Sequence, residues 1–166
     1  MTNPDITIRS ATVRDADAVC GIYNPHIRGS IVTFEEIEVA PSEMSTRIAG
    51  IIQSFPWLVV EQNGALLGYA YAGNFSDRSA YRHSVFSTIY VDEKAQRKGI
   101  GTILYTALLE RLRLSNIHVV VGGIALPNAA SVALHEKCGF KKVAHLSEVG
   151  FKFGRWIDVG YWQIAL

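Results

Sequence analysis

The sequence is poor in cysteine, in proline and in charge of one sign. It has two cysteines and five prolines in 166 residues, and 16 basic side chains nearly balance 15 acidic ones, for a formal net charge of +1. So small a charge provides no general attraction for nucleic acid. Cys20 and Cys138 each lie in an apolar helical pattern, which favours packed thiols over a disulfide, a metal pair or a nucleophile. We therefore expect a protein of the reducing cytoplasm that has no nucleic-acid partner and binds no metal.

Long hydrophobic runs, internal repeats and low-complexity segments are also absent. No stretch approaches the roughly 20 apolar residues that cross a bilayer, and residues 1–5 lack a basic segment followed by an apolar run. Hydrophobic residues make up 49% of the chain and charged residues 19%, which is typical of a globular protein. A chain of this length can bury one continuous core. We expect a single domain over residues 1–166, without a membrane partner.

Hydrophobic periodicity predicts an α/β (α+β) protein with a mixed sheet and helices on both of its faces. Asn63-Gly64 is typical of a tight antiparallel hairpin, and Pro25 predicts the end of the first helix. The nearly continuous apolar run 118–124 predicts a buried central strand, parallel to the strand 84–91. In chain order we expect strand 6–9, helix 14–24, helix 41–54, strands 57–61, 66–71 and 84–91, a helix after the glycines at 99 and 101, strand 118–124, helix 128–138, and strands 142–148 and 156–164.

A glycine-bearing basic turn connects the strand 84–91 to the helix that follows it. Gly99 and Gly101 allow positive φ angles and a close approach of the backbone to a ligand. The first amides of the helix have no intrahelical acceptor, and Arg97 and Lys98 add full charges beside them. Such a turn is suited to a phosphate. The turn lacks the Gly-Lys-Ser/Thr of nucleotide triphosphate loops, and three antiparallel strands precede it, which disfavours a dinucleotide fold.

Residues 96–101, Gln-Arg-Lys-Gly-Ile-Gly, match the Gln/Arg-x-x-Gly-x-Gly/Ala motif of the GCN5-related N-acetyltransferase (GNAT) superfamily. Residues 128–140 resemble a second signature of that superfamily, a helix that begins with Asn and ends in Gly-Phe. Along nearly its whole length the chain resembles the phosphinothricin and methionine sulfoximine N-acetyltransferases, most specifically over residues 149–160. The resemblance implies the GNAT acyl-CoA N-acyltransferase fold, acetyl-CoA as co-substrate, and acetylation of the amino group of a small amino-acid-like amine.

The resemblance also implies which residues bind acetyl-CoA. The backbone of the last residues of the strand 84–91 would contact the pantetheine and the acetyl carbonyl, and the glycine turn would hold the pyrophosphate. Asn128 would contact the pantetheine arm and Lys137 the nucleotide end. The full set is Ile89, Tyr90, Val91, Arg97, Lys98, Gly99, Ile100, Gly101, Thr102, Asn128 and Lys137.

Two residues are candidates for catalysis. His135 holds a position near the coenzyme sulfur in the resembling family, where it would act as a general acid; alternatively it is a packed helix histidine bonded to Ser131. The family's proton-accepting Glu is replaced here by Phe86. Glu35 is our first candidate to replace it, ahead of Asp77 and His83, although a solvated loop carboxylate is an equal alternative. The amine could also bind already neutral, with water as the proton outlet.

Acceptor recognition would depend on Phe34, Ser76, Asp77, Arg78, Phe86, Ser87 and Thr88. Arg78 would pair with a substrate carboxylate or phosphinate, and Phe34 with Phe86 would favour a more apolar acceptor than phosphinothricin. Two alternatives remain open: a non-catalytic acyl-CoA-binding module, suggested by Phe86, and a peptide N-terminal acetyltransferase. Members of the resembling subgroup commonly form homodimers, and the aromatic residues of the run 151–162 provide a surface for one.

Overall fold

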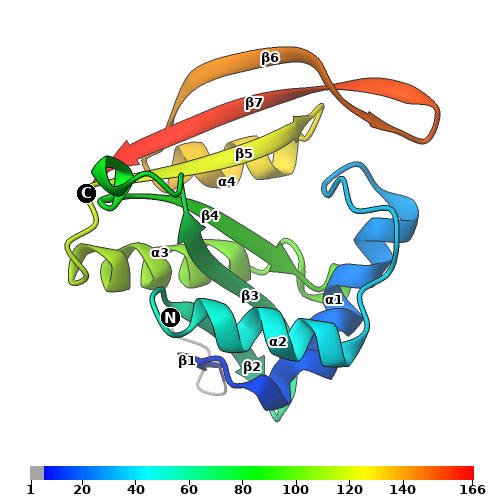
Figure 1. The fold of residues 1–166 in the computed structure, drawn as a ribbon. Helices are drawn as coiled ribbons and strands as arrows, with labels where there is room; N and C mark the ends of the chain where they lie inside the picture. The colour runs from blue at the N-terminus through cyan, green and yellow to red at the C-terminus, as the bar shows by residue number, and fades with distance from the viewer. Residues whose placement is uncertain (1–5) are drawn as a thin grey trace.

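The computed structural model describes residues 6–166, which form one seven-stranded mixed sheet with the strand order β1-β2-β3-β4-β5-β7-β6. Four α-helices flank it (Figure 1). The predicted fold class and order of elements are confirmed; the prediction for residues 1–5 lies outside the described range. The elements are β1 Ile6–Ser10, η1 Val13–Asp15, α1 Ala16–Gly29, α2 Pro41–Ile51, β2 Trp57–Gln62, β3 Ala65–Asn74, η2 Ser79–Tyr81, β4 Ser84–Val91, η3 Glu93–Ala95, α3 Ile100–Arg113, β5 Val119–Leu126, α4 Ala129–Lys137, β6 Lys141–Lys152 and β7 Arg155–Ala165.

The sheet is antiparallel except where β4 pairs with β5 in parallel. The predicted hairpin is present, with Asn63 and Gly64 both at positive φ between β2 and β3. A parallel pair needs a crossover, and α3 provides it. The glycine turn therefore opens the crossover helix at the carboxyl end of β4.

Two apolar cores cover opposite faces of the sheet, and the alternation along β2 shows how they are divided. Leu58 and Val60 pack with α3 in one core, whereas Trp57 and Val59 pack with α1 and α2 in the other. This is the period of two expected for a strand buried on both faces. The predicted helical layers on both faces are thus confirmed, with α1 and α2 on one side and α3 and α4 on the other (Figure 1).

The prediction that Pro25 ends the first helix is wrong, because α1 continues through it to Gly29. An interior proline costs a helix roughly 3 kcal/mol. The apolar side chains on both sides of Pro25, Ile22 and Tyr23 before it and Ile27 after it, are at most 7% exposed. Burial of their apolar surface against the sheet offsets that cost, so tertiary packing extends the helix by one turn.

Three smaller predictions also need correction. Gly101 lies inside α3 with helical φ, and the second positive φ of the turn belongs to Arg97. The spacing of Ile103, Leu104, Ala107, Leu108 and Leu112 predicts that all five face the core, but Ile103 is 44% exposed, whereas Tyr105 is fully buried. The run 150–155 was predicted to connect the last two strands, yet β6 continues to Lys152 and β7 begins at Arg155.

Cys20 is buried in the core beneath α1 and Cys138 is half-buried, and both are free thiols. Between Ile6 and Leu166, no helix combines the length and the apolar character that crossing a bilayer requires. Within the same range, no three His, Cys, Asp or Glu side chains gather closely enough to hold a metal ion.

Candidate active site

A cavity of about 670 Å³ opens where β4 and β5 separate. The two strands pair only at Ser84, Val85 and Phe86, opposite Val119–Val121. Beyond Phe86 each strand continues without the other as its neighbour, so the gap between them widens toward the glycine turn and α4. The volume is in the usual range for a small-molecule site.

Backbone groups of β4 are free along this gap. The amide of Asp92 donates to the carbonyl of Leu67 on β3, at 2.8 Å. Because peptide groups of a strand face alternate sides, Tyr90 also turns its amide toward β3, whereas Ile89 and Val91 turn theirs toward the gap. Ile89 and Val91 therefore offer donors and acceptors to a ligand that lies along β4, and Tyr90 presents its side chain to the cavity instead.

The glycine turn has the geometry of an anion site. Gly99 is the N-cap of α3 with φ +78°, a conformation that L side chains adopt only with strain. Its carbonyl accepts from the amide of Ile103, so the amides of Ile100, Gly101 and Thr102 have no partner within the helix. A Cβ on Gly101 would lie 3.2 Å from the side chain of Leu134 of α4, so glycine allows α3 and α4 to approach closely here.

Most of the residues predicted to bind acetyl-CoA meet at this cavity. Arg97, before α3, and Lys137, at the end of α4, bring positive charge to it, and the N-terminus of α3 adds partial positive charge. Lys98 is the exception, because it lines a smaller hollow together with Lys94 and Ile103. The predicted donor residues that line the cavity are Ile89, Tyr90, Val91, Arg97, Gly99, Ile100, Gly101, Thr102, Asn128 and Lys137.

Asn128 and His135 are fixed by hydrogen bonds of α4. The side-chain oxygen of Asn128 accepts from the amide of Ser131 at 3.1 Å, as an N-cap does. His135, 4% exposed, lies 2.8 Å by Nδ1 from the carbonyl of Ser131 and 3.1 Å by Nε2 from the hydroxyl of Tyr105. The hydroxyl of Tyr105 in turn lies 2.5 Å from that of Ser87 on β4.

These contacts assign the protons of the neutral imidazole. Nδ1 can only donate to a carbonyl oxygen, so Nε2 accepts from Tyr105, whose oxygen then accepts from Ser87. Burial lowers the pKa of His135 from its ordinary value of 6.5, partly countered by the bond to Ser131. A general acid needs the protonated ring, and burial disfavours that form. The arrangement supports the alternative, a packed histidine bonded to Ser131 that also positions Tyr105 and Ser87.

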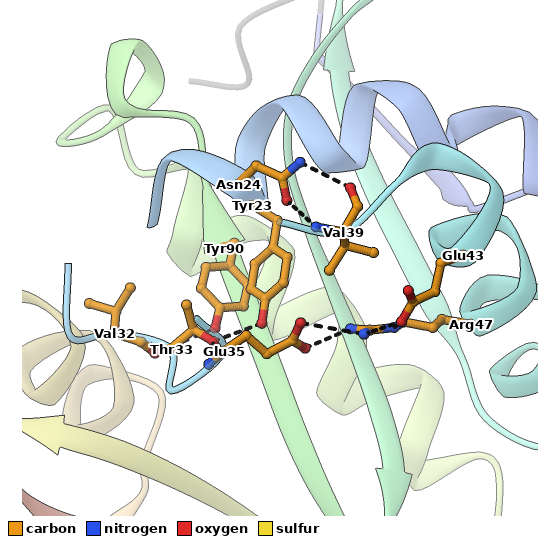
Figure 2. A network of polar contacts seen from close by, with 9 residues as sticks. All are labelled: Tyr23, Asn24, Val32, Thr33, Glu35, Val39, Glu43, Arg47 and Tyr90. Atoms are coloured by element: carbon orange, nitrogen blue, oxygen red, sulfur yellow. Dashed lines mark hydrogen bonds and ion pairs between the residues drawn. The ribbon is translucent and has the colours of Figure 1, made fainter. Parts of the chain in front are cut away.

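Glu35, the first candidate for the base, is engaged elsewhere (Figure 2). Its two carboxylate oxygens accept from Arg47 of α2, the shorter contact being 2.6 Å, and Arg47 also pairs with Glu43. Glu35 is not among the residues that line the cavity. The ion pair ties the segment between α1 and α2 to α2 and engages both carboxylate oxygens of Glu35.

The other candidate bases lie outside the cavity lining as well. Asp77 is exposed in the segment between β3 and β4, together with Arg78, and the neighbouring Ser76 is half-buried. His83 lies 2.9 Å by Nδ1 from the carbonyl of Asn116. Ser87 and Thr88 do line the cavity. Of the residues predicted to recognise the acceptor, the structure brings only these two to its wall.

Phe86 belongs to an aromatic cluster beside the cavity. Its ring stacks on Phe75 at 4.9 Å between centroids and lies 6.2 Å from Tyr161, and Phe75 also packs against Tyr81. A Cβ on Gly123, a cavity residue, would lie 3.3 Å from the ring of Tyr161. Phe86, Phe75, Tyr81 and Tyr161 thus form an apolar surface that adjoins the cavity at Thr88 and Gly123; we call it the aromatic cluster.

Sequence reasoning missed the residue that holds the segment between α1 and α2 against the sheet. Lys152 of β6, 2% exposed, donates to the carbonyls of Ser30 and Thr33 at 2.9 and 2.8 Å. Phe34 packs directly on Gly150 of the same strand, where a larger residue would clash with its ring. The contacts join positions more than 110 residues apart, and no local pattern in the sequence could have signalled them.

His26 is a second missed residue. It lines the cavity together with Val32, and its ring lies 5.4 Å from that of Tyr90. The expectation that α1 ends at Pro25 placed His26 in a loop, whereas the helix carries it to the cavity wall. Burial lowers the pKa of His26 from its ordinary 6.5.

Comparison with known proteins places these features among acetyltransferases. Residues 8–160 match the family model described as acetyltransferase (GNAT) domain. The chain is 42% identical to the phosphinothricin N-acetyltransferase of Streptomyces viridochromogenes, over 95% of this chain and 86% of that protein. It is 35% identical to the L-methionine sulfoximine/L-methionine sulfone acetyltransferase of Salmonella typhimurium, over 97% of this chain and 95% of that protein.

Solved structures of acetyltransferases have the same fold as this chain. A phosphinothricin acetyltransferase of Sinorhizobium meliloti in complex with acetyl-CoA superposes with a TM-score of 0.93 at 33% identity, covering 98% of this chain and 89% of the other. A ribosomal-protein-alanine N-acetyltransferase of Brucella melitensis gives 0.94 at 37% identity, covering 96% and 99%. The two neighbours share the fold of this chain but are named for acceptors of different kinds.

Proposed function

The chain belongs to the GNAT acetyltransferase family, and from that premise we propose that it transfers the acetyl group of acetyl-CoA to the amino group of a small amino-acid-like compound, of the phosphinothricin, methionine sulfoximine or methionine sulfone type. The observation that carries the proposal is the cavity at the β4–β5 gap, lined by free strand amides and by the glycine turn. Similarity over nearly the full length to enzymes named for such acceptors supports the substrate class.

The residues present fit acetyl-CoA. The amides of residues 100–102 and the side chain of Arg97 would bind the pyrophosphate, and Lys137 would lie at the nucleotide end. The side-chain amide of Asn128, whose oxygen is engaged as the N-cap, keeps its NH₂ for the pantetheine arm. Ile89 and Val91 would direct main-chain amides at the pantetheine and the acetyl carbonyl, where they stabilise the negative charge that develops on the carbonyl oxygen.

The acceptor would bind beside Thr88, with its side chain against the aromatic cluster. Phe86 places an apolar ring where the resembling family has a carboxylate; the rings of Phe75 and Tyr161 lie beside it, and Tyr81 packs on Phe75. Desolvation therefore favours an acceptor with an apolar side chain over phosphinothricin. Phe34, packed on Gly150, and Arg78, exposed between β3 and β4, do not line the cavity; they would approach the acceptor from outside it, Arg78 by pairing with a substrate carboxylate.

The deciding experiment is a thiol-release assay with acetyl-CoA over a panel of amines. The panel holds phosphinothricin, methionine sulfoximine and methionine sulfone, apolar and aromatic amino acids, and a peptide that begins with alanine. Turnover of amino acids with a preference for apolar side chains supports the proposal. A preference for small polar amino acids refutes the aromatic acceptor site, and Phe86→Glu should shift selectivity toward phosphinothricin.

Two other functions are outcomes of the same assay. The similarity to a ribosomal-protein-alanine N-acetyltransferase favours a peptide acceptor as the second candidate, and turnover of the peptide alone would select it. Binding of coenzyme A by calorimetry without thiol release for any amine would indicate a non-catalytic acyl-CoA-binding module. If the protein neither binds coenzyme A nor releases thiol, it is not an acetyltransferase and the proposal fails.

Dimerisation and location are further parts of the proposal. β6 is an edge strand, and it exposes Val143, Val149 and Phe151, each more than half accessible, beside the exposed Trp156 of β7. A homodimer would cover this apolar edge, and light scattering should then give twice the 18.3 kDa of one chain. The two free thiols suit a cytoplasmic protein.

A further inference from the structure

The proposed reaction needs a group that removes a proton from the acceptor. An α-amino group has a pKa of about 8, so most of it is the non-nucleophilic ammonium at pH 7. No carboxylate lines the cavity among the described residues. Phe86 occupies the place of the family's Glu, and Glu35 is held by Arg47. The proton acceptor must therefore be another kind of side chain or water.

Imidazole is the remaining neutral base at the cavity wall, and two histidines are available there. His135 has both ring nitrogens engaged, Nδ1 with the carbonyl of Ser131 and Nε2 with the hydroxyl of Tyr105. To take a proton it would have to give up the bond in which it accepts from Tyr105. His135 is therefore a poor base as well as a poor acid.

His26 is not committed in this way. Neither of its ring nitrogens makes a hydrogen bond with another residue in the range 6–166, and the ring is half-buried at the cavity against Tyr90. α1 holds it rigidly, because the buried side chains of Tyr23 and Ile27 fix the helix on both sides of it. A free imidazole on a rigid element is suited to proton transfer.

The charges around His26 leave it neutral at pH 7. Burial, the largest effect, lowers its pKa from 6.5, and Lys152 of β6 lowers it further. Glu93 and Asp92, which follow β4, oppose that shift without reversing it. The tyrosines beside it, Tyr23 and Tyr90, stay uncharged because burial raises the pKa of both. A neutral imidazole has the lone pair that a base requires.

We propose that His26 is the general base of the acetyl transfer, in place of the carboxylate lost at Phe86; this assignment rests on the proposed function. His26 takes one proton from the substrate ammonium, directly or through one water, and later releases it to solvent. The amine lone pair then forms the N–C bond with the acetyl carbonyl carbon as the C–S bond breaks. The second amine proton leaves with the sulfur, which departs as the free thiol of coenzyme A.

The test compares wild type with His26→Gln and His26→Ala, with His83→Gln as a control histidine outside the cavity. Loss of a positioned base should lower kcat/KM about 100-fold or more. In wild type kcat/KM should also fall as the pH drops below a pKa under 6.5, and this acidic limb should vanish in His26→Gln. Added imidazole should partly restore His26→Ala, which a merely structural role would not allow. His83→Gln should match wild type.

Thermal unfolding and calorimetry with coenzyme A show that each variant is folded and binds the donor. An unchanged kcat/KM and pH profile in a folded His26→Gln overturns the proposal. A weaker affinity for coenzyme A with unchanged kcat also overturns it, because His26 would then serve the donor. If the wild type releases no thiol with any amine, the proposed function itself is wrong. If the wild type and the variant are equally active, only the assignment of His26 is wrong.

Discussion

The proposed donor side of the cavity and its proposed acceptor side are built by different kinds of contact. Most of the proposed donor side comes from one stretch of chain, the end of β4 and the turn at 96–102, and many of its groups are main-chain atoms; Asn128 and Lys137 complete it from α4 and its N-cap. The proposed acceptor side is assembled from β4, β7 and the segment between β3 and β4 in the aromatic cluster, and from the segment between α1 and α2 that Lys152 and Phe34 attach to β6. A backbone site depends on local conformation, whereas a side-chain site depends on which distant strands meet.

The strongest test of this contrast is Gly99→Val. Gly99 has φ +78°, where an L residue is strained by about 1–2 kcal/mol and a β-branched one by more. The turn should relax and withdraw its amides, weakening coenzyme A about 30-fold in calorimetry, which corresponds to about 2 kcal/mol. Gly64, in the hairpin far from the cavity, has the same φ and is the matched control. Gly64→Val should lose stability but keep coenzyme A binding; equal losses of binding would contradict a local donor site.

Lys152→Met should weaken binding of the acceptor without changing the affinity for coenzyme A. The change leaves the carbonyls of Ser30 and Thr33 without their donor, which costs about 1–3 kcal/mol in urea unfolding. The released segment should raise the acceptor KM several-fold while the affinity for coenzyme A stays the same. Lys141→Met, on the exposed start of β6, serves as the control. A parallel loss of coenzyme A affinity would show that the two sides are coupled.

His135→Gln tests a buried contact of the cavity wall, because His135 reaches Ser87 through the hydroxyl of Tyr105. Loss of its bond with Tyr105 should cost about 1 kcal/mol at pH 7. Burial lowers the pKa of His135, so between that pKa and 6.5 the unfolded chain binds more protons than the folded one. Wild-type stability therefore falls as the pH drops below about 6.5. Urea midpoints at pH 7.5 and 5.5 should show a smaller fall in His135→Gln; identical falls would remove His135 as a contributor.

Glu35→Gln should have the smallest effect. Its ion pair with Arg47 is about one-third exposed on each side, so its contribution to stability should stay below about 1 kcal/mol. If Glu35 anchors a segment and transfers no proton, kcat should remain within about two-fold of wild type. A loss of about 100-fold in kcat would restore Glu35 as the base and displace His26.

The sequence predicted the architecture well, because its signals are local. Alternation along the strands, Asn63-Gly64 between β2 and β3, and Asn128 at the start of α4 each report on a few neighbouring residues, and each is confirmed. The glycine turn could be predicted for the same reason, although the positive φ expected at Gly101 is found at Arg97. Gly101 instead lies close to Leu134, a residue of another helix.

The acceptor side could not be predicted to the same degree. Glu35 was our first candidate for the base, but its carboxylate is engaged by Arg47, an arginine on α2. His26 was overlooked because Pro25 is a local stop signal, which the buried face of α1 overrides. In both cases the competing interaction comes from residues that the sequence pattern does not bring together.

The sequence by itself determined the order of strands and helices, the alternation that builds two cores, and the strand, turn and helix that present free amides. These depend on backbone preferences and on short periodicities, which neighbouring residues set. Only the tertiary structure decided that β4 and β5 part beyond Phe86, that Lys152 reaches the carbonyls of Ser30 and Thr33, and which histidine nitrogens stay free. Burial and hydrogen bonding between distant segments fix those properties, because a side chain's partners and protonation depend on what surrounds it in space.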